Sequence, residues 1–260
     1  DMFKGVQPYD AAAVAKLAIV ISKEAGELPA KFPAGSDKAP TRSLPAVWTK
    51  KDDFNKRFAA LKAGADALAA HTIAIQVPSL TFMAMLGFSL AATVRVGRAY
   101  GAGDVAGIRL AGWTAFAMVM VLAAATAVMM ILAGRPIVGL FLDLDDPANH
   151  IVVSLAVTYL LFAGLFQFFD AGQVAASGML RGLGDTRMPM IYAGLGYWGV
   201  GMVLCVILAF PLGLEGIGIW TGLAAGLGAV AALMTLRWIR RDRLGLTSRP
   251  PPDVHPAPAH

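Results

Sequence analysis

A single carboxylate stands inside a long apolar run of this sequence. Gln167, Asp170 and Gln173 recur three residues apart, and Ser177 follows four residues later, so together they form one polar stripe on an otherwise apolar helix. A lone carboxylate near the middle of a bilayer costs about 2.5–3.5 kcal/mol, so Asp170 should face protein or water. Apolar surroundings favour its protonated form and a neighbouring cation favours the carboxylate. A group held between these states is suited to coupling with a proton or a sodium ion.

Two other interpretations of Asp170 stay open: a structural hydrogen bond between helices, or a loop position if the helix ends early. Gln76 is a weaker candidate in another apolar run, where it could line a cavity or bond backbone. The aromatic residues of the runs, among them Tyr197 and Trp198, are interpreted as interface anchors or packing residues. Ser, His and Asp are too sparse for a catalytic constellation, so we expect no enzyme, no cofactor and no metal site other than sodium at Asp170.

Five apolar runs must position these residues. They cover residues 71–94, 110–133, 151–169 (continuing to 180 past Asp170), 188–214 and 216–236. About 20 helical residues cross a bilayer, and the runs lack the alternation of a barrel strand. The chain is also 57% hydrophobic and only 15% charged. We therefore predict an all-α polytopic membrane protein with five transmembrane helices, preceded by a short soluble helical segment.

The composition divides the chain into three segments. Residues 1–67 form the soluble segment, in which Asp10 should cap a helix over 11–28 and Asp52 or Asp53 should open a second helix. Residues 68–240 form the transmembrane domain. Within it, the sequences GAGD at 101–104 and GLGD at 182–185 predict a glycine that ends one helix and an aspartate that caps the next. Residues 241–260 form a basic, proline-rich tail that we expect to be disordered.

Arginines predict the orientation. The loops at 95–109 and 181–187 and the tail hold ten of them, whereas the alternate loops hold only Arg135; the ten are Arg95, Arg98, Arg109, Arg181, Arg187, Arg237, Arg240, Arg241, Arg243 and Arg249. The positive-inside rule then puts the tail in the cytoplasm and residues 1–70 in the periplasm of a bacterium, across the inner membrane. The arginines are spread over loops and form no continuous soluble patch, so nucleic acid is not expected as a partner.

Four motifs of the transmembrane domain resemble one transporter family. They are AAHTIAIQ at 69–76, ATVRVGRAYGAGD at 92–104, FQFFDAGQ at 166–173 and GMLRGLGDTRMP at 178–189. In this order and spacing they are similar to the last five of the twelve helices of the multidrug and toxic compound extrusion (MATE) family. The resemblance implies antiport of organic, often cationic, drug-like compounds against H⁺ or Na⁺, with Asp170 at the place of the acidic coupling residue.

The same resemblance implies an incomplete transporter. Nothing in the sequence matches the first six-helix lobe or the seventh helix of the family, and a site at the middle of the membrane needs a second wall. The implied partners are therefore membrane lipid, organic cation substrates and a complementary transporter lobe.

Residues 1–70 resemble part of another family. PYDAAAV at 8–14, LPAKFPAGSD at 28–37, LPAVW at 44–48 and FNKRF at 54–58 are similar to cytochrome c-prime, a haem-binding four-helix bundle. That family attaches haem through Cys-x-x-Cys-His, whereas this sequence has one cysteine, Cys205, so covalent haem is excluded. Phe32 and Trp48 are then expected to be core residues without a haem pocket.

Three functional hypotheses follow from these resemblances. The first is part of a drug or cation antiporter. The second is an inactive remnant of a gene fusion or assembly error, joined at the alanine-rich stretch near residues 64–70. The third is a haem or electron-transfer protein with a membrane anchor.

Overall fold

The computed structural model describes residues 10–33, 36–38, 43 and 46–248. The chain divides into two compact units. Unit 1 comprises Asp1–Leu80 and Ala127–Gly164, and unit 2 comprises Thr81–Thr126 and Leu165–His260. Parts of the cytochrome-like motifs, at residues 8–9, 34–35 and 44–45, lie outside the described residues, as does most of the predicted disordered tail.

Helices account for nearly all of the described chain, and no strand occurs among those residues. In chain order they are α1 (Ala11–Glu27), η2 (Leu28–Lys31), η3 (Ser36–Lys38), α2 (Ala46–Thr49), α3 (Lys51–Gly101), α4 (Val105–Leu132), α5 (Gly134–Gly139), η4 (Pro147–Asn149), α6 (His150–Gly182), α7 (Arg187–Gly194), η5 (Leu195–Met202), α8 (Val203–Ala209) and α9 (Glu215–Ile239).

Five of these stretches are long and apolar enough to cross a membrane: Lys51–Gly101, Val105–Leu132, Pro147–Gly182, Arg187–Ala209 and Glu215–Ile239. Each contains most of one predicted apolar run, so the prediction of an all-α protein with five transmembrane helices is confirmed. The fourth span is not a uniform α-helix, because its middle, η5, is a π-helix between α7 and α8.

The first span begins earlier than its apolar run. Helix α3 has 51 residues and continues without interruption from Lys51 through the expected boundary near residue 68. At about 1.5 Å per residue it is about 75 Å long, whereas the hydrocarbon core of a bilayer is about 30 Å thick. The predicted second soluble helix and the first transmembrane helix are therefore one continuous helix.

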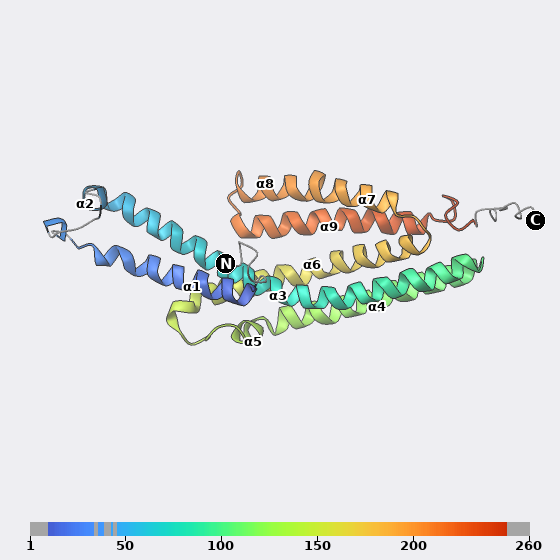
Figure 1. Ribbon diagram of the computed structural model, residues 1–260, viewed down its shortest axis with the longest axis horizontal. Coiled ribbons are helices and arrows are strands. Elements are labelled where there is room, and N and C mark those ends of the chain that lie inside the picture. Colours follow the sequence, from blue (N-terminus) through green and yellow to red (C-terminus); the bar gives the residue numbers. More distant parts are fainter. Residues whose placement is uncertain (1–9, 34–35, 39–42, 44–45, 249–260) are drawn as a thin grey trace, which may run out of the picture. The chain divides into compact units, whose positions relative to one another are not determined.

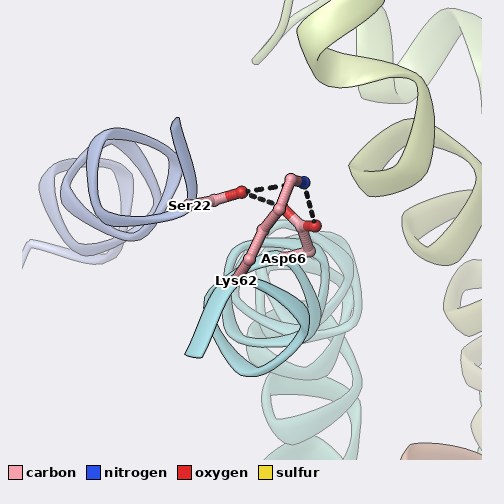
Figure 2. A network of polar contacts seen from close by, with 3 residues as sticks. All are labelled: Ser22, Lys62 and Asp66. Carbon is pink, nitrogen blue, oxygen red and sulfur yellow. Dashed lines mark hydrogen bonds and ion pairs between the residues drawn. The ribbon is translucent and has the colours of Figure 1, made fainter. Parts of the chain in front are cut away.

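In unit 1, helix α1 packs against the first part of α3. Asp10 caps α1 as predicted and accepts hydrogen bonds from the amides of Ala12 and Ala13. Farther along, Ser22 of α1 donates a hydrogen bond to the buried carboxylate of Asp66 on α3, and the Lys62 ammonium lies 2.8 Å from the same carboxylate (Figure 2). These contacts join α1 to α3.

Replacing Asp66 with Ala is expected to loosen α1 from α3. The change leaves the Ser22 hydroxyl and the Lys62 ammonium without their shared acceptor. Removing one partner of a fully buried ion pair costs several kcal/mol. Because one third of the Lys62 side chain is exposed, water can solvate its charge, and we expect a loss of about 2 kcal/mol. Hydrogen exchange of the α1 amides checks this. In the control Asp53→Ala, which breaks an exposed ion pair with Arg57, α1 should stay protected; equal exchange in both variants would contradict the prediction.

Aromatic side chains from the segment between α1 and α3 and from the start of α3 pack on one another. The ring of Phe32 lies 5.9 Å from that of Trp48 and 5.4 Å from that of Phe54. Lys51 reaches over Phe54 and donates hydrogen bonds to the carbonyls of Pro29 and Phe32. The rings therefore pack on one another and on a lysine.

In unit 2, the later part of α3 packs closely on the later part of α6. Ser89 donates to the carbonyl of Val174, and Thr93 donates to the carbonyl of Gly178 at 3.0 Å. A Cβ at Gly182 would lie 2.9 Å from the carbonyl of Thr93. Small residues and hydroxyls therefore bring these two helix backbones together, as is typical of membrane helices.

Helix α9 packs against the fourth span through three glycines spaced four residues apart, Gly218, Gly222 and Gly226 (Figure 1). A Cβ at each would come within 2.7 Å of backbone atoms of Ala209, Cys205 and Gly201, in that order. This small-xxx-small pattern is a recognised signal for close packing of membrane helices. It is present in the sequence and indicates which face of α9 meets α8 and η5.

The two glycine-aspartate loops differ from each other. Gly103 and Gly184 both adopt positive φ, as a helix-ending glycine should. Asp104 accepts a hydrogen bond from the amide of Gly107 at 2.8 Å, so it caps α4 as predicted. Asp185 does not cap α7, because its carboxylate instead accepts from the guanidinium of Arg237. Asp185 therefore forms a long-range ion pair instead of the predicted helix cap.

Candidate functional site

A mostly apolar cavity that contains a buried acidic residue lies within unit 2. It has a volume of about 890 Å³, and its walls come from the later parts of α3 and α6 and from η5, α8 and α9. Most of the lining is apolar and aromatic, including Phe82, Phe166 and Phe210. Its size is that of a site for a drug-sized molecule.

Asp170 supplies the negative charge of this cavity. It lies on α6, is only 7% exposed and lines the cavity. Among the described residues, none donates a hydrogen bond to its carboxylate or forms an ion pair with it. The interpretation of Asp170 as a loop residue is therefore wrong, since α6 continues to Gly182. The structure shows no interhelical hydrogen bond at this carboxylate either.

The polar stripe of α6 continues from Asp170 along the cavity wall. Gln173 and Ser177 both line the cavity, as the stripe predicts. Arg181 lies at the end of the same wall and donates to the Ser177 hydroxyl at 3.4 Å. It is eleven residues from Asp170, or about 16 Å along the helix, so it does not neutralise that carboxylate directly.

Gln167 has a different environment from Asp170. Its side chain is fully buried, and its amide nitrogen donates to the hydroxyl of Thr81 on α3 and, at 3.4 Å, to that of Thr126 on α4. Gln167 is not among the residues that line the Asp170 cavity. It therefore bridges three helices, and the expected stripe separates into one packing residue and three cavity residues.

Gln76 lies on the part of α3 that belongs to unit 1, where it is half-buried. The Asp170 cavity is formed wholly by residues of unit 2. The structure therefore does not place Gln76 among the residues that line this cavity.

Two aromatic residues of η5 belong to the cavity wall. Tyr197 and Trp198, which the sequence alone suggests as interface or packing residues, line the cavity together with Asp170. They lie in the π-helix, which is a frequent feature of functional sites. Glycines flank them in the sequence GYWGVG at 196–201. Closely spaced glycines are a signal for close packing of membrane helices, so the sequence could have indicated that η5 contacts another helix.

The residues of the soluble segment do not fit a covalently attached haem. The sequence has a single cysteine, Cys205, which lies in the fourth span. Phe32, Trp48 and Phe54 fill the space beside Lys51 with their own rings. In the described part of the chain, no group of three or more His, Cys, Asp or Glu side chains is placed to hold a metal ion.

Five helices long and apolar enough to cross a membrane, with a cavity between several of them, define a polytopic helical membrane protein. Residues 57–207, more than half of the chain, match the family model described as MatE. The chain belongs to the MATE family, whose members are transporters and not enzymes.

Relatives with closely similar sequences match about two thirds of the chain. The chain is 54% identical over 180 residues to the "Probable multidrug resistance protein NorM" of Mesorhizobium japonicum and 56% identical over 177 residues to that of Brucella suis. It is 50% identical over 175 residues to the "Multidrug resistance protein NorM" of Burkholderia vietnamiensis. These matches cover 67–69% of this chain but only 38% of each relative, so the chain spans well under half the length of those proteins.

Solved structures agree on the fold. The eukaryotic MATE transporter AtDTX14 matches 82% of this chain with a TM-score of 0.59 and 22% identity, over 51% of its own length. An inward-facing multidrug resistance MATE family transporter of the MOP superfamily matches 80% of the chain with a TM-score of 0.60 and 19% identity, over 50% of its length. At these identities the likeness supports the fold alone.

The amino-terminal segment has its own similarity. Residues 1–80 match the family model of cytochrome c′, and this match overlaps the MatE match over residues 57–80. The overlap falls on the continuous helix α3.

Proposed function

We propose that this chain is the five-helix part of a multidrug efflux transporter in a bacterial inner membrane. It would bind organic, often cationic, compounds in the Asp170 cavity and exchange them for H⁺ or Na⁺. The observation that carries this proposal is the buried Asp170 carboxylate, which faces a mostly apolar cavity of about 890 Å³ without a partner among the described residues. A charge that is so placed needs a counter-ion, which the coupling ion or a cationic compound can supply.

The lining favours lipophilic cations among organic compounds. Phe82, Phe166, Tyr197 and Trp198 offer aromatic faces around the single carboxylate. Aromatic faces attract cations, and the attraction grows when water is excluded. In the same proposal, Gln173 supplies a hydrogen-bonding group at the cavity wall, while Gln167 acts only by holding α6 against α3 and α4.

Transport would require a second lobe. Unit 2 supplies one wall of helices, whereas alternating access needs a site between two bodies that move against each other. The chain matches 38% of the length of its NorM relatives. A complementary six-helix lobe is therefore the partner that this proposal requires. By the positive-inside rule, the same proposal puts the tail in the cytoplasm and the amino-terminal segment in the periplasm.

A flux measurement tests the proposal. The purified chain is reconstituted in liposomes with and without a co-expressed six-helix lobe taken from the first half of a NorM relative. A fluorescent lipophilic cation should then move in response to an imposed pH or sodium gradient, and the gradient that works identifies the coupling ion. The lobe alone serves as the control.

The second candidate is an inactive fusion remnant. It is favoured by the cytochrome c′ match over residues 1–80 and by its overlap with the transporter match. If the lobe and the chain together give no more flux than the lobe alone, and the chain binds no lipophilic cation, the remnant hypothesis is correct. Long-read sequencing across the codons for residues 60–75 tests independently whether the junction exists in the genome.

A further inference from the structure

A buried arginine follows helix α9 in unit 2. Arg241 is 5% exposed, its guanidinium lies 4.7 Å from the ring of Trp238, and its Nη1 donates to the Trp238 carbonyl at 3.0 Å. Its Nε is buried and has no hydrogen-bond partner among the described residues. The nearest carboxylate, that of Asp242, is 3.7 Å from Nη2 and more than half exposed. The charge of Arg241 is thus only partly compensated by protein groups.

Trp238 brings this arginine to helix α4. Its ring is fully buried and occupies the space over Gly112, where a Cβ would overlap it. Arg241 is one turn beyond Trp238, and Arg109 is one turn before Gly112. Both arginines therefore line one cavity, of about 900 Å³, together with Val105, Ala106, Leu110, Trp113 and Asp242.

Arg109 has no hydrogen-bond or ion-pair partner among the described residues. It is also exposed. The cavity therefore combines two guanidinium groups, one carboxylate and several apolar side chains. That composition fits an anion that also carries an apolar part.

An apolar groove adjoins this cavity. It lies between α3 and α4 within unit 2, has a volume of about 570 Å³ and includes Arg95 and Thr114 in its lining. Many of the residues that line the groove are small: Ala91, Ala99, Gly107, Ala111 and Ala115. Leu110 lines both this groove and the cavity that contains Arg109 and Arg241. A chain of methylene groups that enters this groove would start beside the arginines.

We propose that Arg109 and Arg241 bind the phosphate of an anionic phospholipid, with one acyl chain in the groove between α3 and α4. The arginine fork matches phosphate oxygens, and basic pockets between membrane helices are suited to anionic head groups. Trp113 has the amphipathic side chain that is typical of the head-group region. The carboxylate of Asp242 opposes an anion, but it already accepts a hydrogen bond from Thr247 and pairs with Arg241.

The test measures lipid binding to the purified full chain in detergent by native mass spectrometry, with dioleoyl phosphatidylglycerol and dioleoyl phosphatidylcholine as probes. The wild type should retain phosphatidylglycerol preferentially. Arg109→Gln should weaken this binding about fivefold, since one arginine near an anionic lipid contributes about 1 kcal/mol. The matched control is Arg98→Gln, which removes an exposed arginine near the same helix ends that lines neither cavity.

Three results would overturn the proposal. They are equal retention of the two lipids, equal weakening by Arg109→Gln and Arg98→Gln, and displacement of phosphatidylglycerol by inorganic phosphate at the same concentration as the lipid. The last result would mean that the two arginines bind free phosphate and not the head group of a lipid. Because Arg109 is exposed, its replacement should not prevent folding, and an unchanged thermal melting curve of Arg109→Gln confirms this.

Discussion

Asp170→Asn is expected to reduce gradient-driven flux of a lipophilic cation to the level of the complementary lobe alone. Asn has nearly the same shape as Asp but can neither ionise nor bind a proton reversibly at physiological pH. The cavity then keeps its aromatic walls and loses its only carboxylate. Binding of the compound could persist weakly through the rings, whereas exchange with H⁺ or Na⁺ should stop, because the coupling ion has lost its site.

The measurement compares flux and binding in the same preparation. Gln167→Leu is the matched control, since it alters a buried polar residue one turn away on α6 that bridges Thr81 and Thr126 and does not line the cavity. Gln167→Leu should cost about 1 kcal/mol of stability and leave coupled flux largely intact. If Asp170→Asn retains coupled flux, Asp170 is not the coupling residue, whatever the cavity binds.

Gly222→Leu is expected to separate α9 from the fourth span. A Cβ at position 222 would lie 2.7 Å from the Cα of Cys205, and that backbone cannot yield without moving α8 as a whole. Overpacking of this kind typically costs about 1–3 kcal/mol, and more where two backbones are in contact. Because η5, α8 and α9 all line the Asp170 cavity, compound binding should fall together with stability.

The melting temperature in detergent and the protease resistance of α9 check this prediction. The control is Gly199→Leu in η5 of the fourth span, because a Cβ at position 199 meets nothing within 4 Å. We expect Gly199→Leu to melt close to the wild type and Gly222→Leu to melt several degrees lower. Equal melting temperatures would mean that α9 does not depend on the glycine contacts.

The sequence alone predicts the five spans and the presence of a carboxylate within the third. The reason is that a bilayer imposes a length of about 20 apolar residues on each helix and makes a charge inside it conspicuous. The caps at Asp10 and Asp104 were also predictable, because a cap depends on a few neighbouring residues. The three glycines of α9 carried a further local signal, since their spacing alone marks a closely packed face.

Tertiary structure decided which of these faces meet. The helical period puts Gln167 and Asp170 on one face of α6. It does not predict that Gln167 contacts Thr81 and Thr126 whereas Asp170 faces a cavity. The local sequence GLGD likewise predicts a cap at Asp185, whereas Arg237, 52 positions later, donates to that carboxylate. Arg109 and Arg241 share a cavity only because Trp238 packs on Gly112. Periodicity depends on the geometry of one helix, whereas pairing depends on the shapes of two, and only the folded chain brings those shapes together.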